Sequence, residues 1–209
     1  MSAAPIRWYF DFISPFAYMQ WPRVRAVMAE FPIVPTPILL AAVLDRCGQK
    51  GPAEIPAKRE FTYRHVLWQA RQAGIALRFP PAHPFNPLAA LRLCVAAGAT
   101  PDAIERVFDW VWAQGRPADS AEALAVLRET MGVPEHALGD AAVKTALREN
   151  TEQALAAGVF GVPTLALGKH LFWGNDAHEF AMAALRDPGL LEAPEMRQAA
   201  ELPVGVQRG

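Results

Sequence analysis

The sequence predicts an α/β fold in which two small strand-containing units flank a long helical stretch. Three observations predict it. A strand–helix–strand pattern fills residues 6–39, helical segments without a convincing strand follow, and a strand–turn–strand–helix pattern comes near the end. The 209 residues suit one domain, or one domain that carries an insertion. Apolar residues make up 52% of them, which allows a full-sized core and excludes general disorder.

The first unit begins with a strand over Ile6–Phe12, where large apolar residues alternate with others. Ser14 and Pro15 then indicate a helix start, because serine favours the N-cap and proline favours the first helical position. A second strand over Ile33–Leu39 completes the strand–helix–strand unit.

Helical segments occupy the middle of the chain, and most of them stop at a glycine, which is favoured just after a helix end. The predicted helices are Lys58–Ala73, Pro87–Ala97, one capped by Thr100 with Pro101 first, one from Asp119 or Ser120 to Gly132, and one from Asp140 to Gly158. We expect Trp68, Trp110 and Trp112 to lie in the core rather than in a pocket.

The second unit returns to strands, over Val162–Leu167 and His170–Trp173. The turn Gly174-Asn175-Asp176 is expected to cap a last helix. The chain after Pro188 is expected to be poorly ordered or to pack along the surface.

This order of elements predicts a thioredoxin-like domain that is split by a large all-helical insertion. The thioredoxin-like domain takes residues 1–52 and 158–187, the helical insertion takes 53–157, and 188–209 form a C-terminal tail.

The charge balance and the cysteine count exclude several classes of protein. Twenty Lys and Arg face 21 Asp and Glu, so the net charge of −1 offers no basic field for a nucleic acid. Cys47 and Cys94 are too few for a disulfide framework or a zinc cluster, and we expect separate thiols rather than one bridge. No signal peptide, membrane-spanning run or metal-like histidine spacing is found, so we expect a soluble cytoplasmic protein without membrane partner or metal.

Ser14 is the first candidate for chemistry. It lies at a strand-to-helix turn, where the helix N-terminus stabilises an anion. Proteins with a thioredoxin-like order keep a reactive CxxC pair at this turn, and here the tetrapeptide is Ser14-Pro15-Phe16-Ala17. Disulfide exchange needs two sulfurs, so this activity is excluded. The alternative is a plain N-cap serine.

The segment Asp11-Phe12-Ile13-Ser14-Pro15-Phe16-Ala17-Tyr18 resembles the N-terminal motif of the 2-hydroxychromene-2-carboxylate isomerases, relatives of the kappa-class glutathione transferases. The likeness continues in order at Gly51-Pro52, Ile55–Lys58, Phe79-Pro80, Phe85-Asn86-Pro87, Gly158–Thr164 and Phe172–Asp176. This resemblance implies a DsbA-like fold, a homodimer, glutathione as cofactor and a small aromatic substrate.

The resemblance also implies roles for single residues. Ser14 would be catalytic, because its hydroxyl would hold the glutathione sulfur as thiolate. Glutathione would contact Ser14, Lys58, Val162, Pro163, Trp173, Gly174, Asn175 and Asp176, and the second substrate would contact Gln49, Phe85 and Asn86. The Val162–Pro163 peptide bond would be cis. Two departures from the family are Ala177, where many relatives place Arg, and Ala42–Asp45, which lacks a lysine often found near position 44.

Each of these residues also has an ordinary structural explanation. Val162-Pro163 could be a trans peptide at a strand start, Asp176 a simple cap, Lys58 a solvated surface charge and Phe85 a packed loop residue. The activity expected from the resemblance is isomerisation of 2-hydroxychromene-2-carboxylate to trans-o-hydroxybenzylidenepyruvate by reversible addition of glutathione thiolate. The alternatives are a kappa-like transferase or peroxidase, and a non-catalytic module that binds glutathione or a peptide.

Overall fold

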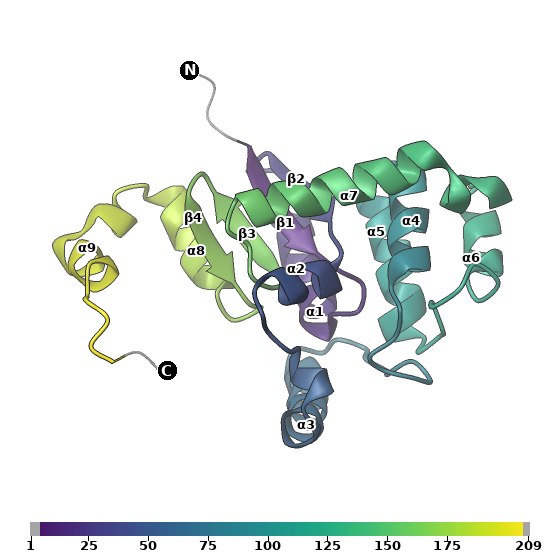
Figure 1. Cartoon of the computed structure of the whole chain (residues 1–209), viewed down its shortest axis with the longest axis horizontal. Coiled ribbons are helices and arrows are strands. Elements are labelled where there is room, and N and C mark those ends of the chain that lie inside the picture. The colour runs from purple at the N-terminus through teal and green to yellow at the C-terminus, as the bar shows by residue number, and fades with distance from the viewer. Residues whose placement is uncertain (1–4, 207–209) are drawn as a thin grey trace.

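A four-stranded mixed sheet forms the centre of the fold (Figure 1). The computed structural model describes residues 5–206. The sheet has the order β2–β1–β3–β4 and consists of β1 (Ile6–Phe10), β2 (Ile33–Pro37), β3 (Thr164–Leu167) and β4 (His170–Trp173). β1 pairs parallel with β2, and the other two pairs are antiparallel. This sheet confirms the predicted strand–helix–strand and strand–strand–helix units.

Helices make up most of the remaining structure. They are α1 (Pro15–Val27), α2 (Leu40–Arg46), α3 (Pro56–Gln72), α4 (Leu88–Ala96), α5 (Pro101–Phe108), α6 (Ala125–Thr130), α7 (Ala141–Ala156), α8 (His178–Arg186) and α9 (Pro194–Ala200). A π-helical turn over Asp109–Ala113 extends α5, and short 3-10 turns lie at Pro52–Glu54, Glu135–Gly139 and Leu190–Glu192. No strand of the described chain lies between β2 and β3, so the helical middle is confirmed.

The two faces of the sheet bury different clusters, because side chains alternate along a strand. Trp8, Phe10 and Leu165 belong to the larger cluster, which also takes in buried residues of α1, α4, α5 and α8. Tyr9 and Ala166 belong to the smaller cluster on the other face, with residues of α2 and α7. The sheet is therefore covered by helices on both faces (Figure 1).

Phe108 of α5 joins the helical middle to the sheet. Its ring is fully buried and lies 4.7 Å from the Phe12 ring centroid, 5.6 Å from that of Phe10 and 6.3 Å from that of Trp8. Such edge and tilted ring contacts stabilise beyond the area they bury. The helical segment thus packs directly on β1 and on the turn that follows it.

Helix α7 spans both parts of the molecule (Figure 1). Leu147 lies in the larger cluster and Ala154 in the smaller one. The hydroxyl of Thr151 accepts a hydrogen bond from the Leu39 N–H at 3.1 Å, and it donates to the Leu147 carbonyl at 2.9 Å. The bond from Leu39, which lies between β2 and α2, joins this segment to α7.

Three elements differ from their prediction. α2 was not predicted, because its seven residues have no side-chain cap and follow a strand directly. α6 is shorter than expected, since residues 121–124 form turns although the Ser120 hydroxyl accepts from Ala123 N–H. The expected tail contains α9, which begins with Pro194 at a first helical position.

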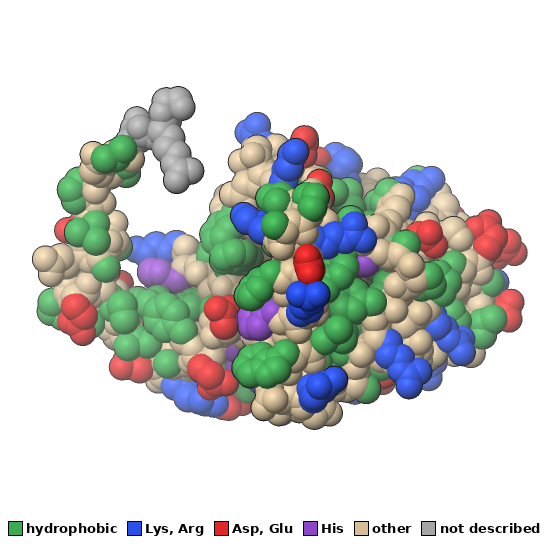
Figure 2. Space-filling model, turned by 90° about the horizontal axis from the view of Figure 1, so that it is seen from below, with side chains coloured by type: hydrophobic (Ala, Val, Ile, Leu, Met, Phe, Trp, Pro, Cys, Tyr) green, Lys and Arg blue, Asp and Glu red, His purple; other side chains and the backbone are tan. Residues whose placement is uncertain are grey.

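The tryptophan prediction is right for two residues and wrong for the third. Trp110 and Trp112 are buried, whereas Trp68 on α3 is 57% exposed. Phe61, His65 and Trp68 lie one helical turn apart, and their rings stack with centroids 5.4 and 6.0 Å apart. Figure 2 shows hydrophobic side chains gathered on this side of the molecule. Helical spacing alone could not tell this exposed stripe from a core stripe.

Both cysteines are free, which confirms the expectation of separate thiols. Cys47 is exposed and Cys94 is buried. Within residues 5–206, no helix has the length and apolar character needed to cross a membrane.

Replacing Phe108 by alanine should lower the free energy of unfolding by about 3–5 kcal/mol, the usual cost of emptying a large aromatic site in a core. Phe61→Ala is the matched control, because Phe61 is 68% exposed and leaves no cavity when truncated. Urea titration of both variants measures the two costs. An equal, small loss for both variants would contradict the role of Phe108 as the joint between the two parts.

Candidate functional site

Several of the residues selected from the sequence lie at one end of the sheet. Tyr9 of β1 pairs with Thr164 of β3, and Thr164 pairs with Trp173 of β4. Because β1 runs antiparallel to β3, the turn after β1 and the loop before β3 lie at the same end of the sheet. The turn after β4 lies there as well. Ser14, Val162-Pro163 and Gly174 thus belong to one region of the molecule.

Ser14 caps helix α1, as predicted. Its Oγ accepts a hydrogen bond from the Ala17 N–H at 3.2 Å, and the residue is 6% exposed. A hydroxyl has one donor and two acceptor lone pairs, so this bond uses only an acceptor. The hydroxyl proton remains available for an anion placed at the N-terminus of the 13-residue helix.

Two side chains from the helical middle hold the turn that presents Ser14. Trp112 Nε1 donates to the Phe12 carbonyl at 2.8 Å, and His83 Nε2 lies 2.8 Å from the Ile13 carbonyl. Since a carbonyl only accepts, Nε2 of His83 carries the proton. Burial lowers the pKa of His83, which favours the neutral ring.

Asp11 holds the same turn from the other side. Its carboxyl group is fully buried and accepts from the backbone N–H groups of Ile13 at 3.1 Å and of Leu40 at 2.8 Å. These bonds join the Ser14 turn to the N-terminus of α2. Burial raises the pKa of Asp11 to about 7, although the backbone hydrogen bonds act in the opposite direction.

A second set of hydrogen bonds joins the loop before β3 to the turn after β4. The Val162–Pro163 peptide bond is cis, as the family resemblance implied. The Pro163 carbonyl accepts from Gly174 N–H at 2.8 Å, and the Gly174 carbonyl accepts from Gln20 Nε2 at 3.0 Å. Gln20 is itself fixed by Trp8 Nε1, which donates to its Oε1 at 2.6 Å.

Trp173 lies over this loop and is 54% exposed. Its ring centroid is 5.3 Å from that of Phe160. A Cβ atom at Gly161 would lie only 2.5 Å from the Trp173 Nε1, so the glycine makes room for the indole. Trp173 and Phe160 therefore form an open aromatic surface beside the cis-proline loop.

The predicted capping role of Asp176 is wrong. Helix α8 begins at His178, its N-cap is Ala177, and no side chain caps it. Asp176 instead lies in a turn, and its carboxyl group sits against Gly174, where it would clash with any added Cβ atom. The φ of +100° at Gly174 also favours glycine. The carboxylate is exposed and makes no ion pair with any residue in 5–206.

Asn175 is already engaged within the protein. Its side-chain Oδ1 and its backbone carbonyl both accept from Arg23 Nη2 at 2.7 Å. The turn is thus anchored to α1 through Arg23 and Gln20. Sequence reasoning missed these two residues, although a glutamine beside apolar neighbours in the first helix is an unusual polar residue.

The other predicted contacts belong to the helical middle of the chain and to the loop before it. Lys58 is exposed in the first turn of α3, and Gln49 is exposed in the loop after α2. Phe85 is half-buried, with its ring centroid 6.2 Å from that of His83. The side chain of Asn86 accepts from Leu88 N–H at 3.1 Å, at the start of α4. Within residues 5–206 no cluster of three His, Cys, Asp or Glu side chains could hold a metal ion.

Comparison with known proteins places the chain in a family. The model of the DSBA-like thioredoxin domain matches residues 5–186. A 2-hydroxychromene-2-carboxylate isomerase of Pseudomonas putida is 32% identical over 180 residues, which cover 82% of this chain and 89% of that protein. The kappa 2 glutathione S-transferase of Caenorhabditis elegans is 30% identical over 177 residues, which cover 76% of this chain and 78% of that protein.

A solved structure of a 2-hydroxychromene-2-carboxylate isomerase superposes with a TM-score of 0.75 and 26% identity, over 96% of this chain and all of the other. The chain belongs to the DSBA-like thioredoxin family, and within it to the group that contains the 2-hydroxychromene-2-carboxylate isomerases and the kappa-class glutathione transferases. It is an enzyme of this group.

The raised pKa of Asp11 predicts a pH-dependent stability. The folded protein holds this proton more tightly than the unfolded chain, whose carboxyl has the ordinary value of 3.8. The resulting stabilisation is complete below about pH 4 and is lost as the pH rises through about 7. Asp11→Asn should therefore flatten the pH profile over this range, by at most about 1.4 kcal/mol per pH unit, the limit for one proton. Urea titrations from pH 4 to pH 8 measure it, and parallel profiles of the two proteins would contradict the assignment.

Proposed function

We propose that the protein is a glutathione-dependent isomerase that converts 2-hydroxychromene-2-carboxylate into trans-o-hydroxybenzylidenepyruvate. The observation that carries this proposal is the Ser14 hydroxyl. It caps α1, keeps its proton free, and stands where a disulfide enzyme would carry its first cysteine. The similar protein of Pseudomonas putida is named a 2-hydroxychromene-2-carboxylate isomerase, which supports this substrate and an isomerisation.

Three features of the site suit glutathione. The Ser14 hydroxyl can donate to a sulfur anion at the helix N-terminus. Within residues 5–206 the backbone N–H and C=O of Val162 make no hydrogen bond, so they can pair with an extended peptide as an added strand would. The exposed Asp176 carboxylate can accept from the ammonium group at the γ-glutamyl end of glutathione.

Bound glutathione would supply a thiolate that adds reversibly to the conjugated system of the substrate. Ser14 lowers the pKa of that thiol through its hydrogen bond and the helix terminus. The Trp112 and His83 hydrogen bonds hold the turn, so that Ser14 stays aimed at the sulfur. Lys58, at the start of α3, can meet the glycyl carboxylate. Phe85, Asn86 and Gln49 are candidates for contacts with the second substrate.

A kappa-type glutathione transferase is the second candidate, because the Caenorhabditis elegans relative is nearly as similar. Both activities would use the same Ser14 and the same thiolate. Turnover of 2-hydroxychromene-2-carboxylate with a measured amount of glutathione separates them. Glutathione that returns unchanged beside isomerised product supports the isomerase, whereas a stable conjugate supports the transferase. Tight binding without turnover would leave only a binding module.

Ser14→Ala should lower glutathione-dependent turnover at neutral pH by roughly ten- to a hundredfold, the worth of a hydrogen bond to a charged group. The fold should survive, since losing an N-cap costs about 0.5–2 kcal/mol. The control replaces Cys47 and Cys94 by serine and alanine, respectively. Burial raises the pKa of the Cys94 thiol, which disfavours a reactive thiolate there. The proposed reaction uses the thiol of glutathione and neither thiol of the protein, so neither change should affect turnover. Full activity of Ser14→Ala, or inactivity of the folded cysteine variant, would overturn the proposal.

Asp176→Asn should weaken glutathione binding by roughly ten- to a hundredfold, because it removes the charge that pairs with the ammonium group. Since Asp176 does not cap α8, the helix should be unaffected. Titration calorimetry with glutathione measures the change. Asp187→Asn, which alters an exposed carboxyl at the far end of α8, is the control. Equal affinities of wild type and Asp176→Asn would mean that this turn does not bind the cofactor.

A further inference from the structure

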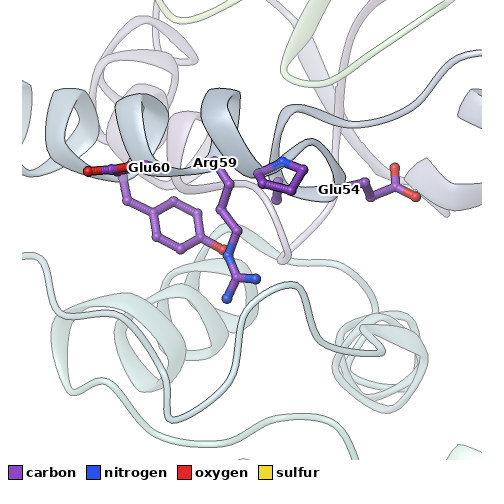
Figure 3. Close-up of a pocket in the computed structure, with 6 residues that line it drawn as sticks. Glu54, Arg59 and Glu60 are labelled. Atoms are coloured by element: carbon purple, nitrogen blue, oxygen red, sulfur yellow. The ribbon is translucent and has the colours of Figure 1, made fainter.

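An open hollow of about 400 Å³ lies where the first turns of α3 meet the 3-10 turn before it (Figure 3). Ala53, Glu54, Pro56, Arg59, Glu60 and Tyr63 line it. Neither Ser14 nor the cis-proline loop nor the turn after β4 contributes to its wall. The hollow is therefore separate from the residues that the proposed function assigns to the thiol and the γ-glutamyl end of glutathione.

One positive charge faces this hollow without a carboxylate partner. The Arg59 guanidinium lies over the Tyr63 ring, 5.5 Å from its centroid. Within residues 5–206, Arg59 takes part in no ion pair. Arginine offers a planar fork of donors that matches a carboxylate.

The two acidic residues of the wall are occupied elsewhere. Glu54 accepts a hydrogen bond from Gly51 N–H at 2.5 Å, and Glu60 forms an ion pair with Arg64 at 2.8 Å. Figure 3 shows them on opposite sides of Arg59, with the Glu54 carboxylate directed away from the guanidinium. The hollow is consequently suited to an anionic group beside Arg59.

The hollow is connected to the Ser14 turn. The Tyr63 hydroxyl lies 2.6 Å from His83 Nδ1 and 2.7 Å from the His83 carbonyl. His83 in turn contacts the Ile13 carbonyl, directly before Ser14. A single side chain thus separates the wall of the hollow from the reactive turn.

Tyr63, the aromatic residue of the wall, belongs to a larger aromatic cluster. The Tyr63 ring centroid lies 4.5 Å from that of Phe79, and the Phe79 ring packs edge-on against Trp112 at 5.4 Å. A flat aromatic ligand in the hollow can pack on the Tyr63 ring while a carboxylate at its end reaches the Arg59 guanidinium.

We propose that this hollow binds the carboxylate of the aromatic second substrate, and that Arg59 is the residue that recognises it. This inference rests on the proposed function, since it concerns the partner of the thiolate at Ser14. It makes Arg59 a determinant of specificity, which selects aromatic acids over neutral aromatic molecules. The same chemistry could also serve the glycyl carboxylate of glutathione, so the test must distinguish the two sources.

The test compares Arg59→Gln and Arg59→Lys with Arg71→Gln, which removes the same charge from an exposed position of the same helix. Binding of trans-2-hydroxycinnamate, of its uncharged amide and of glutathione is measured by calorimetry. Arg59→Gln should weaken binding of the acid by roughly ten- to a hundredfold and leave the amide and glutathione unchanged. Arg59→Lys should lie between, and Arg71→Gln should match the wild type. With 2-hydroxychromene-2-carboxylate, Arg59→Gln should raise KM more than it lowers kcat.

Unchanged binding of the acid, or an equal loss for acid and amide, would overturn the role of Arg59. Weaker glutathione binding with an unchanged affinity for the acid would assign the hollow to the cofactor instead. If the acid binds in an Arg59-dependent way but no glutathione-dependent turnover occurs, the proposed function fails while the carboxylate site stands.

Discussion

The site depends on how firmly the turn after β1 is held. Two consecutive carbonyls of this turn, those of Phe12 and Ile13, accept hydrogen bonds from Trp112 and His83. Both donors come from the helical middle of the chain, far away in the sequence. A buried carboxyl, Asp11, binds the turn from the other side. Ser14 therefore keeps its place at the α1 N-terminus because the helical segment and the sheet close around its backbone, not through its own side chain alone.

Hydrogen bonds from distant residues also hold the two loops beside this turn at the same end of the sheet. The Gln20 side chain accepts a hydrogen bond from Trp8 on β1 and donates one to the Gly174 carbonyl. The Gly174 N–H donates to the Pro163 carbonyl. Helix α1 thus supplies the reactive N-terminus and, one and a half turns later, the side chain that aligns the two loops opposite. Buried polar groups of this kind form a connected hydrogen-bond network, so replacing one of them weakens the hydrogen bonds of the others.

Sequence patterns predicted the fold well because the residues that begin and end its helices are local signals. Ser14-Pro15 and Thr100-Pro101 begin helices as expected, and the two strand units pair as the order of elements indicated. The patterns failed where tertiary contacts decide which side chains are buried and where a helix begins. Trp68 has core-like spacing but an exposed face, and Asp176 looks like a cap although α8 begins beyond it. His83 carries no local signal, since its partners lie on other elements, and Gln20 stands out only as a polar residue beside apolar neighbours. Arg59 and Tyr63 lie one helical turn apart on α3, and this spacing alone does not indicate a binding site. The homodimer, the cytoplasmic location and the domain boundaries stay predictions.

The central claim is that the Ser14 hydroxyl stabilises a thiolate at the N-terminus of α1. The most direct measurement is the pKa of the thiol of protein-bound glutathione, followed by ultraviolet absorbance of the thiolate in wild type and in Ser14→Ala, at saturating cofactor. A free thiol titrates near 8.5. The account predicts a bound-thiol pKa clearly below that value in the wild type, and a rise of about one to two units in Ser14→Ala, the equivalent of one hydrogen bond to a charged group. The same pKa in both proteins would contradict it.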